Sequence, residues 1–522
     1  MKRKEETYLL EWYRNPYRKP LIIRGARQVG KSTLVRMFCK KNNLQLVEIN
    51  FEQNQTLQTL FASNDPIKII QSLEILQNVK IDAEKSVLFL DEIQANPAAI
   101  LSLRYFFEKV PGLAVIAAGS LLEFALEQYK LSMPVGRIEY FFMGPMHFEE
   151  FLEAVGADQL LSYLQTYSLG DEIPQAIHEK ALEYLRTYYL LGGMPEVISV
   201  YRETKSLLQA DKIKYSILNT YRDDFAKYQT RIDISKLQEV FDKLGSTVGK
   251  KIKYVELLPQ DRSTVTDRIL TLFEYARILY RTYHSSANNL PLKTEINQKY
   301  SKGILLDIGL YLTLQGLSIA DIVQDKSLFF SCQGALAEQF IGQHLLYSQP
   351  TYMNPELYYW NREKAQSNAE VDFLIQQGNT ILPIEVKSGK TGTLKSLHVF
   401  METKQRSLAL RFSTNTPVVE TVKSTLPKSD YCYTLVTLPL YLVGQTRRLM
   451  KGINTSGQAM DSGGVASFSA PRDGVSHLAF PALTRERNHH ADSFPLAPLG
   501  NENGRTESFI SGDSDEECVS KG

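Results

Sequence analysis

The first third of the chain alternates short apolar runs with segments of helical periodicity. Between residues 20 and 143, runs such as PLIIRG, SVLFLDE and LAVIAAGS are each followed by a segment whose apolar positions recur at helical spacing. Apolar runs of this length that alternate with helices are typical of a parallel β-sheet covered on both faces. The pattern therefore predicts an α/β fold for this region.

Three further patterns follow. Residues 147–245 are helical by periodicity, residues 246–315 predict short helices and a hairpin, and residues 328–445 mix a helix with strands. From about residue 452 the chain is rich in Gly, Ser, Asn and Pro and ends in an acidic run. Such a segment buries too little apolar surface to offset the entropy of ordering, which predicts a disordered tail. A chain of 522 residues is also long enough for two to four domains.

Composition narrows the class of protein. Apolar residues make up 43% of the chain and charged residues 22%, as in an ordinary globular protein. The 59 basic and 58 acidic residues nearly cancel, so no global field favours nucleic acid or an acidic membrane. Cys39, Cys332, Cys432 and Cys518 are far apart, which excludes a disulfide framework and a zinc knuckle. The start of the chain has no apolar signal-peptide core, and no run of eighteen apolar residues occurs, so we expect a soluble cytoplasmic protein with no membrane partner.

A phosphate-binding motif lies between the first predicted strand and the helix that follows it. GARQVGKS at residues 25–32 satisfies G-x-x-x-x-G-K-[ST]. Gly25 and Gly30 allow the backbone to curl so that successive N–H groups face a phosphate, and the helix N-terminus adds its dipole. We expect Lys31 to reach the β- and γ-phosphates and Ser32 to bind Mg²⁺. The predicted nucleotide-binding residues are Gly25, Ala26, Arg27, Gln28, Val29, Gly30, Lys31, Ser32 and Thr33.

A second motif supplies the acids that nucleotide hydrolysis requires. SVLFLDEIQ at residues 86–94 predicts a buried strand that ends in two adjacent carboxylates. Asp91 is placed to hold Mg²⁺ through its water shell, and Glu92 to orient and deprotonate the attacking water. Two solvated acids at a strand end are the alternative. Together the two motifs predict a protein that binds and hydrolyses ATP with Mg²⁺, and GTP is the weaker alternative.

Other polar residues near the predicted site are candidates for supporting roles. Ser120 ends the strand VIAAGS between the strands of the two motifs, where its hydroxyl could bond the γ-phosphate or the attacking water, or cap the next helix. Arg137 follows a loop and could reach the γ-phosphate of a neighbouring copy, which would imply a homo-oligomer; an ordinary surface arginine is the alternative. Arg104 is a weaker candidate for that role. Asn50 could relay the nucleotide state to Glu92, although a solvated turn residue is the simpler interpretation.

The middle of the chain carries a candidate DNA-binding module. Residues 251–283 predict a helix-turn-helix followed by a wing. The second helix leaves Arg262, Thr264, Thr266 and Arg268 on its outer side, where a recognition helix would present them to a major groove. A winged helix that only packs against other domains or proteins is the alternative.

A cluster of carboxylates and a lysine is predicted near the C-terminus. Residues 369–390 predict a hairpin with a Gly-Asn turn, which places Asp372 opposite Glu385 and Glu370 opposite Lys387 on one face, with an apolar opposite face. Directly opposed residues have Cβ atoms about 4.5–5.5 Å apart. Two carboxylates this close repel each other, which favours a divalent cation between them.

The same cluster matches a nuclease pattern. Glu338, from the helix QGALAEQFIGQHLL, joins Asp372 and Glu385 as a predicted Mg²⁺ ligand, and Lys387 would stabilise a metal-bound hydroxide or the phosphorane charge. This arrangement is the D…E-x-K pattern of restriction-endonuclease-like nucleases. The alternative is a degenerate fold whose acids and lysine form surface ion pairs, each worth about 0–1 kcal/mol.

Five segments of the chain support a resemblance to a known family: GARQVGKST, LFLDEIQ, AAGSLLEF, VGRIEYFFMGPMHFEEFL and YLLGGMPEVI. Over about residues 10–445 the chain resembles prokaryotic AAA-type ATPases that carry an uncharacterised C-terminal domain. FMGPMHFEEF departs from the family pattern, so His147 is assigned no chemistry. The resemblance implies four parts: a P-loop, AAA-type α/β ATPase core at 1–145, a helical lid at 146–245, a winged-helix-like module at 246–325 and a restriction-endonuclease-like, PD-(D/E)xK domain at 326–450. The disordered tail at 451–522, expected from its composition, lies outside the resemblance.

Two functions follow from these expectations. The first is an AAA-type ATPase associated with DNA, with a Mg²⁺-dependent nuclease-like module. The second is a nucleotide-dependent switch that binds a protein or DNA partner and cuts nothing; the near-zero net charge mildly favours it.

Overall fold

The computed structural model describes residues 1–120, 122–129, 133–134, 136–225, 232–324, 333–362, 369–389, 393–427, 429–451 and 453. All of them belong to one compact unit, Met1–Ser462. The predicted disordered tail lies outside the described residues, apart from residues 451 and 453. Every helix in this part of the chain is too short or too polar to span a bilayer.

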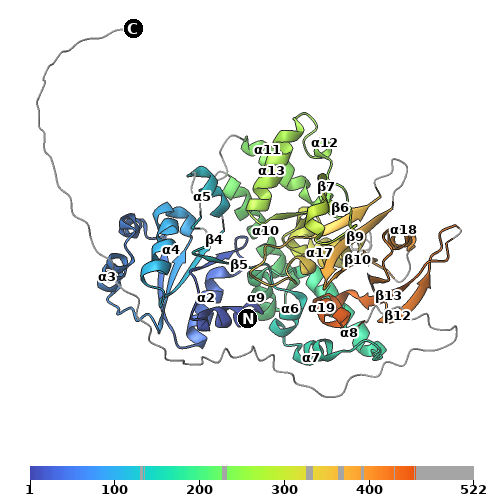
Figure 1. Ribbon diagram of the computed structural model, residues 1–522, viewed down its shortest axis with the longest axis horizontal. Helices are drawn as coiled ribbons and strands as arrows, with labels where there is room; N and C mark the ends of the chain where they lie inside the picture. The colour runs from blue at the N-terminus through green and yellow to red at the C-terminus, as the bar shows by residue number, and fades with distance from the viewer. Residues whose placement is uncertain are drawn as a thin grey trace, which may run out of the picture. The chain divides into compact units, whose positions relative to one another are not determined.

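A five-stranded sheet forms the N-terminal part of the fold, with the order β2-β3-β4-β1-β5 and every neighbouring pair parallel (Figure 1). Its strands are β1 (Leu21–Arg24), β2 (Gln45–Asn50), β3 (Ser86–Asp91), β4 (Ala114–Gly119) and β5 (Glu139–Phe142). The helices of this region are α1 (Glu5–Arg14), α2 (Lys31–Lys41), η1 (Gln55–Ser63), α3 (Pro66–Gln77), η2 (Ile93–Ala95), α4 (Pro97–Lys109) and α5 (Leu122–Gln128). The predicted α/β fold with a parallel sheet is confirmed.

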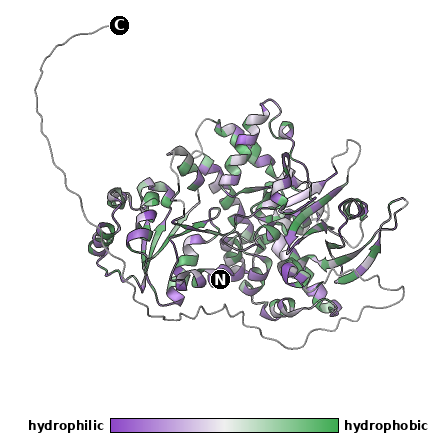
Figure 2. Cartoon of the chain, in the orientation of Figure 1, coloured by the Kyte–Doolittle hydropathy of each residue, from purple (hydrophilic) through white to green (hydrophobic). Residues whose placement is uncertain are grey.

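Both faces of this sheet are buried, because successive side chains of a strand point to opposite faces. Ile23 and Phe89 join one hydrophobic cluster, whereas Ile22 and Leu88 join another. The strands therefore have nearly continuous apolar sequences, and Figure 2 draws them largely in the hydrophobic colour.

Helices follow the parallel sheet, as their periodicity predicts. They are α6 (Phe148–Ala154), α7 (Asp158–Thr166), α8 (Gln175–Leu191), α9 (Pro195–Thr204), α10 (Leu207–Asp223), α11 (Ile234–Lys243), η4 (Leu244–Thr247), α12 (Tyr254–Leu257) and α13 (Ser263–Tyr275). Thr266 was expected on the outer side of α13 but is fully buried. Ile269 and Leu270 follow Thr266 by three and four residues, so all three lie on the helix face that packs into the core.

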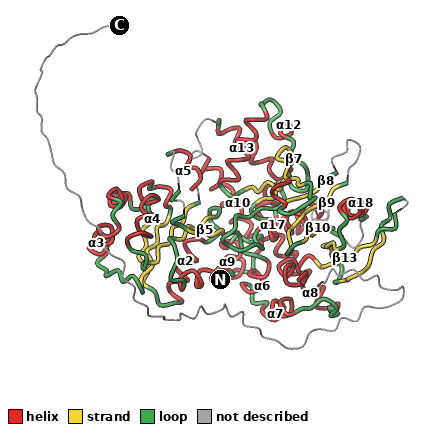
Figure 3. The backbone as a smooth tube through the Cα atoms, viewed as in Figure 1, coloured by secondary structure: helices red, strands yellow, loops and turns green. Residues whose placement is uncertain are grey.

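An eight-stranded mixed sheet occupies the rest of the chain, in the order β12-β13-β11-β10-β9-β8-β6-β7 (Figure 3). Its strands are β6 (Leu279–Ser285), β7 (Ile296–Leu305), β8 (Tyr358–Asn361), β9 (Glu370–Gln377), β10 (Thr380–Val386), β11 (Leu408–Ser413), β12 (Val418–Lys423) and β13 (Cys432–Pro439). The helices around it are η5 (Leu292–Glu295), α14 (Ile308–Leu314), α15 (Ile319–Gln324), α17 (Gln333–Leu346), α18 (Lys395–Lys404), η6 (Leu440–Gln445) and α19 (Thr446–Lys451).

The hairpin β6–β7, expected as the wing of a separate module at 246–325, is part of this sheet. β6 pairs in parallel with β8 through Tyr283 and Tyr358. The strands therefore continue across the expected boundary between residues 325 and 326, and the hairpin shares a backbone hydrogen-bond network with the C-terminal region.

The predicted register of β9 and β10 is confirmed between the Gln377–Thr380 pair and the Phe373–Ile384 pair. Beyond this point the pattern changes, because the pairing of β9 with β8 shifts by one residue. Val371 consequently packs in a different hydrophobic cluster from Val386. The irregularity lies beside Asp372.

Candidate functional site

The loop between β1 and α2 has the backbone that a phosphate site requires. A Cβ at position 25 would lie 2.3 Å from the carbonyl oxygen of Met143, so the close approach of that backbone demands Gly25. Gly30, the residue before α2, has φ +94°, a conformation that favours glycine. Gln28 also has a positive φ, of 63°. The loop thus curls before the N-terminus of α2, where backbone N–H groups remain available to an anion.

Lys31 lies inside this loop and is only 7% exposed. Its Nζ donates hydrogen bonds to the carbonyl oxygens of Gly25, at 3.0 Å, and Ala26, at 2.8 Å. Burial lowers the pKa of Lys31 to about 8, although the carboxylates of Glu92 and Asp91 oppose that change. Two neutral carbonyl acceptors therefore hold the ammonium at the loop. A negatively charged phosphate oxygen is a stronger acceptor and can take their place.

Ser32 and Asp91 form the centre of the site. The Ser32 hydroxyl donates to Asp91, with distances of 2.9 and 3.0 Å to the two carboxylate oxygens. Asn50 Nδ2 donates to Asp91 Oδ2 at 3.3 Å. Burial raises the pKa of Asp91, whereas the hydrogen bond from Ser32 lowers it. A hydroxyl and a carboxylate are hard oxygen donors that suit Mg²⁺, which usually takes one or two carboxylates and completes its shell with phosphates and water.

Glu92 and Ser120 come directly after two neighbouring strands, β3 and β4, at the end of the sheet where these parallel strands finish. β4 lies between β3 and β1, as expected. Glu92 has a left-handed backbone, with φ 51°, and its carboxylate accepts a hydrogen bond of 2.5 Å from Gln94. The Ser120 hydroxyl is buried and has no hydrogen-bond partner among the described residues. A buried hydroxyl without a partner is costly, and at this end of the sheet a ligand oxygen would satisfy it.

Arg137 lies at the opposite end of the sheet, where its parallel strands begin. It precedes Glu139, which pairs with Leu21 at the start of β1, whereas the phosphate loop follows the end of β1. Its Nε is 3.0 Å from Glu108 Oε1, an oxygen that Arg104 also contacts, at 3.1 Å. Arg137 therefore does not join the phosphate loop of its own chain, and a role in hydrolysis would require a second copy.

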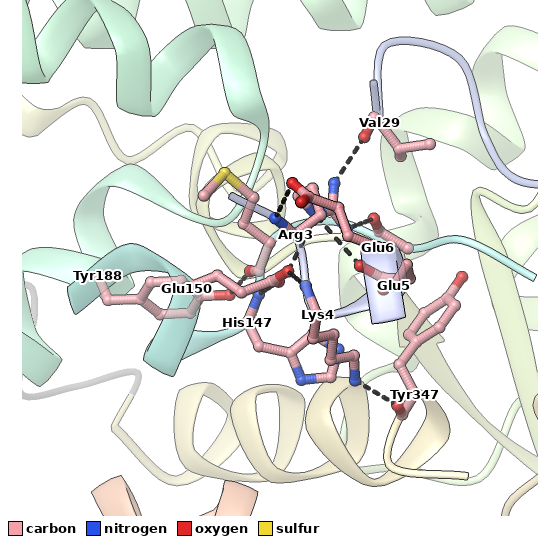
Figure 4. A network of polar contacts seen from close by, with 11 residues as sticks. Arg3, Lys4, Glu5, Glu6, Val29, His147, Glu150, Tyr188 and Tyr347 are labelled. Atoms are coloured by element: carbon pink, nitrogen blue, oxygen red, sulfur yellow. Dashed lines mark hydrogen bonds and ion pairs between the residues drawn. The ribbon is translucent and has the colours of Figure 1, made fainter. Parts of the chain in front are cut away.

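Arg3 is a residue of this site that the sequence did not indicate. It is buried, and its guanidinium donates to the carbonyl oxygen of Val29 in the phosphate loop, at 2.9 Å, and to that of Gly144, at 2.8 Å (Figure 4). Its third contact is Glu150 of α6, at 3.0 Å. Arg3 thus connects the phosphate loop with the loop after β5 and with α6.

Lys4 and His147 extend this network towards the C-terminal region (Figure 4). Lys4 Nζ donates to the carbonyl oxygen of Tyr347, at 2.7 Å. His147 has no catalytic contact: it is the residue before α6, and its backbone N–H donates to Glu150 at 2.7 Å. Burial lowers the pKa of His147 well below its usual value, so the ring is neutral at neutral pH.

Helix α10 and the residue after it contact the phosphate loop from another side. The Tyr221 hydroxyl donates to the carbonyl oxygen of Arg27, at 2.9 Å. The Arg27 side chain forms an ion pair with Asp224, at 2.7 Å. Arg27 was predicted as a loop residue, but its two contacts with this region have no local sequence signal.

The C-terminal carboxylates meet a lysine that the sequence did not indicate. Lys302 of β7 is 2% exposed, and its Nζ contacts Glu370 Oε1. The same Nζ lies 3.6 Å from Glu338 Oε2 and 3.8 Å from Asp372 Oδ1. Burial alone would lower the pKa of Lys302, but the carboxylates of Glu338, Asp372 and Glu370 raise it above its usual value. The ammonium is therefore charged.

Lys387 and Glu385 form a separate pair within this cluster. Lys387 was expected opposite Glu370, but its Nζ lies 2.5 Å from Glu385 Oε1 instead. Asp372 Oδ2 accepts a hydrogen bond of 2.8 Å from the backbone of Val386. Burial and the carboxylate of Asp372 raise the pKa of Glu385.

The cluster does not fit the expected Mg²⁺ site. Within the described ranges, no group of three or more His, Cys, Asp or Glu side chains is arranged to hold a metal ion. Glu338 and Asp372, two of the expected ligands, lie around the ammonium of Lys302, and the third, Glu385, is paired with Lys387. The physical reason is the β6–β7 hairpin, which adds a cation from a strand that the local pattern could not connect to this site.

Comparison with protein families matches three separate parts of the chain. Residues 17–152 match an AAA domain, residues 182–321 match the domain of unknown function DUF8612, and residues 333–441 match the domain of unknown function DUF4143. The second of these spans residues 246–325 almost completely and gives them no winged-helix identity. No curated protein matches the chain.

Several solved structures have a partial likeness to the chain. The Aeropyrum pernix ORC2 protein, in ADPNP–ADP complexes, is 15% identical over 62% of this chain and 94% of its own, with a TM-score of 0.32. The Thermotoga maritima RuvB Holliday junction branch migration motor is 17% identical over 53% and 88%, with a TM-score of 0.26. C. elegans PCH-2 is 11% identical over 39% and 62%, with a TM-score of 0.25. These TM-scores are too low to support an assignment. The matched AAA domain and the geometry of the loop do support one: residues 17–152 form an AAA-type, P-loop α/β domain.

Proposed function

We propose that the chain is an ATPase that binds Mg²⁺ and ATP at residues 25–33 and works as a nucleotide-dependent switch. The observation that carries this proposal is the hydrogen bond between Ser32 and Asp91 beside a glycine-shaped loop that contains Lys31. A hydroxyl and a carboxylate suited to a cation, an ammonium and a helix N-terminus, all where the parallel strands end, supply what a nucleoside triphosphate requires.

The residues have distinct roles in hydrolysis. Ser32 and Asp91 would hold Mg²⁺, which neutralises charge on the phosphates when it is bound. Lys31 exchanges its two carbonyl acceptors for phosphate oxygens. Glu92 orients and deprotonates the attacking water, and the unpartnered hydroxyl of Ser120 bonds the γ-phosphate or that water.

The contacts of the loop carbonyls explain how nucleotide binding reaches the rest of the chain. Val29 accepts from Arg3, which is bound to α6, and Arg27 accepts from Tyr221 of α10. A phosphate that reorients the loop therefore changes hydrogen bonds to two helices of the lid region. We expect these hydrogen bonds to differ between the nucleotide-free and the nucleotide-bound protein, as a switch requires.

ATP turnover of Glu92→Gln tests the hydrolysis step. The substitution keeps the shape of the side chain but removes the base, so turnover falls by about 10²–10⁴-fold while ATP binding persists. Glu84→Gln changes an exposed acid of the same domain and leaves turnover unchanged. Unaltered turnover in Glu92→Gln would sink the assignment of Glu92.

DNA association is a second candidate function, favoured by an exposed basic edge. Arg262 and Thr264 are exposed at the start of α13, and Lys250 and Lys251 are exposed in the preceding segment. Duplex affinity measured at several salt concentrations tests this: phosphate contacts give a steep fall as salt increases, and that slope decreases in Arg262→Ala. Absence of any duplex binding would leave a protein partner as the recipient of the switch.

A homo-oligomer belongs to the same proposal, with Arg137 acting on the nucleotide of a neighbouring copy. Arg137 is 43% exposed at the amino edge of the sheet, where another copy could approach it. The contribution of Arg137 to ATP turnover would then depend on protein concentration, because it requires a second copy.

A further inference from the structure

The carboxylates of the C-terminal cluster come from different elements but meet at one point. Glu370 and Asp372 belong to β9, whereas Glu338 belongs to α17. A single atom, Lys302 Nζ, lies within ion-pair distance of all three. Carboxylate oxygens are also the ligands that a hard divalent cation prefers. Here the convergence point holds a side chain of the protein itself.

We propose that the ammonium of Lys302 takes the position of a divalent cation among Glu338, Glu370 and Asp372, so that this cluster is an internal ion-paired centre rather than a Mg²⁺ site. The proposal concerns a region separate from the nucleotide site and does not depend on ATP hydrolysis.

The position of Lys302 leaves little freedom for another cation. The side chain is 2% exposed, and its backbone is anchored in β7 and bridged to Lys251. On its other side Nζ lies 5.3 Å from the centre of the Tyr359 ring, which favours a cation through its π face. Mg²⁺ needs carboxylate oxygens at about 2.0–2.1 Å and keeps several water molecules. A dication beside a buried ammonium would also meet strong repulsion.

The backbone around residue 249 closes another side of the cluster. Gly249 has φ +68°, and a Cβ at this position would lie 3.2 Å from both carboxylate oxygens of Glu338. The neighbouring residue Val248 bridges to Gly303, next to Lys302 in the chain. This backbone therefore packs directly against the Glu338 carboxylate.

The remaining groups are also engaged with partners inside the protein. Asp372 accepts a backbone hydrogen bond from Val386 on the oxygen that does not face Lys302. Lys387, the lysine expected to serve catalysis, contacts Glu385. The cluster thus joins β7, α17, β9 and β10 through charge, and it fixes the β6–β7 hairpin to the C-terminal sheet.

Manganese binding to the nucleotide-free full chain tests the proposal, because Mn²⁺ substitutes for Mg²⁺ at oxygen sites and is counted by electron paramagnetic resonance. Every sample carries Asp91→Asn, which removes the cation-binding carboxylate of the nucleotide site. This parent binds no Mn²⁺ tighter than about 1 mM. Lys302→Gln gains one Mn²⁺ per chain, with at least about tenfold tighter binding, and loses it again when Asp372→Asn is added.

Two controls make the outcome specific. Lys299→Gln removes an exposed lysine from the same strand and gains no Mn²⁺. Mn²⁺ bound by the parent and lost in Asp372→Asn would overturn the proposal, as would a folded Lys302→Gln chain that gains none.

A second measurement covers the case in which Lys302→Gln does not fold. Mg²⁺ leaves the melting temperature of the parent unchanged when Lys302 already holds the carboxylates. An increase with Mg²⁺ that disappears in Asp372→Asn, or Mg²⁺-dependent nicking of plasmid DNA by the parent that disappears in the same variant, would overturn the proposal.

Discussion

At the nucleotide site Asp91 faces a serine hydroxyl, whereas in the C-terminal cluster Asp372 faces a lysine ammonium. Both aspartates follow or belong to a strand and both are largely buried. The hydroxyl of Ser32 is a neutral donor that can turn and become a metal ligand, but the ammonium of Lys302 already supplies the positive charge. Under the two proposals above, the identity of one neighbouring side chain separates a site open to a cation from one that is closed to it.

The largest expected difference concerns stability. Lys302→Met removes a buried ammonium that contacts three partly buried carboxylates, which costs about 3–5 kcal/mol of unfolding free energy. Lys387→Met costs much less, because Lys387 is partly exposed and contacts one acid. Urea unfolding of both variants checks this, and equal losses would contradict the central position given to Lys302.

ATP turnover should separate the same two regions. Lys31→Ala loses the ammonium proposed to bind the phosphates, so we expect turnover to fall by about 10²–10³-fold. Lys387→Ala leaves turnover unchanged, because Lys387 belongs to the C-terminal cluster. A steady-state ATPase assay checks both variants, and a comparable fall in Lys387→Ala would show that the two regions act as one site.

The affinity for ATP should fall as the pH rises above about 8. In the free protein burial lowers the pKa of Lys31 to about 8, and bound phosphates favour the charged form, so binding above that pH must take up a proton. The loss is at most about tenfold per pH unit. Titrations with ATP between about pH 7 and pH 9.5 test whether the affinity falls as the pH rises. This range runs from about one unit below the pKa of Lys31 to about one and a half units above it. Lys31→Arg remains charged throughout and should show no such dependence.

The smallest expected effect concerns the link between the phosphate loop and α10. Tyr221→Phe removes one hydrogen bond to the carbonyl oxygen of Arg27, so ATP binding changes by about 0.5–1.5 kcal/mol. Tyr215→Phe alters an exposed tyrosine of the same helix and serves as the control. Isothermal titration measures both, and identical affinities would show that this contact does not transmit nucleotide binding.

Features encoded by neighbouring residues could be predicted from the sequence. The parallel sheet, the phosphate loop and the register between Gln377 and Thr380 depend on local periodicity or on a two-residue turn. The burial of Thr266 could also have been found, because Ile269 and Leu270 follow it at helical spacing. These are features for which a short window of sequence contains the physical cause.

Contacts between distant residues could not be predicted in this way. Arg3 reaches Glu150 across 147 positions of the chain. Lys302 lies in a strand whose sequence has no acidic neighbour, and it meets Glu338 and Glu370 only because β6 pairs with β8. No short motif records such pairings, so the sequence indicated the acids of the C-terminal cluster and missed the cation among them.

The pairing of β6 with β8 also determines where the chain can be divided. A fragment that stops at residue 325 would lack β8, and the backbone N–H and C=O groups of β6 that it pairs with would be left open. Exposed strand edges recruit other chains, so such a fragment would tend to self-associate even if its ATPase core folded correctly. A fragment prepared for expression, like any natural recombination between relatives, would have to be cut before residue 279, so that the hairpin stays with the C-terminal sheet.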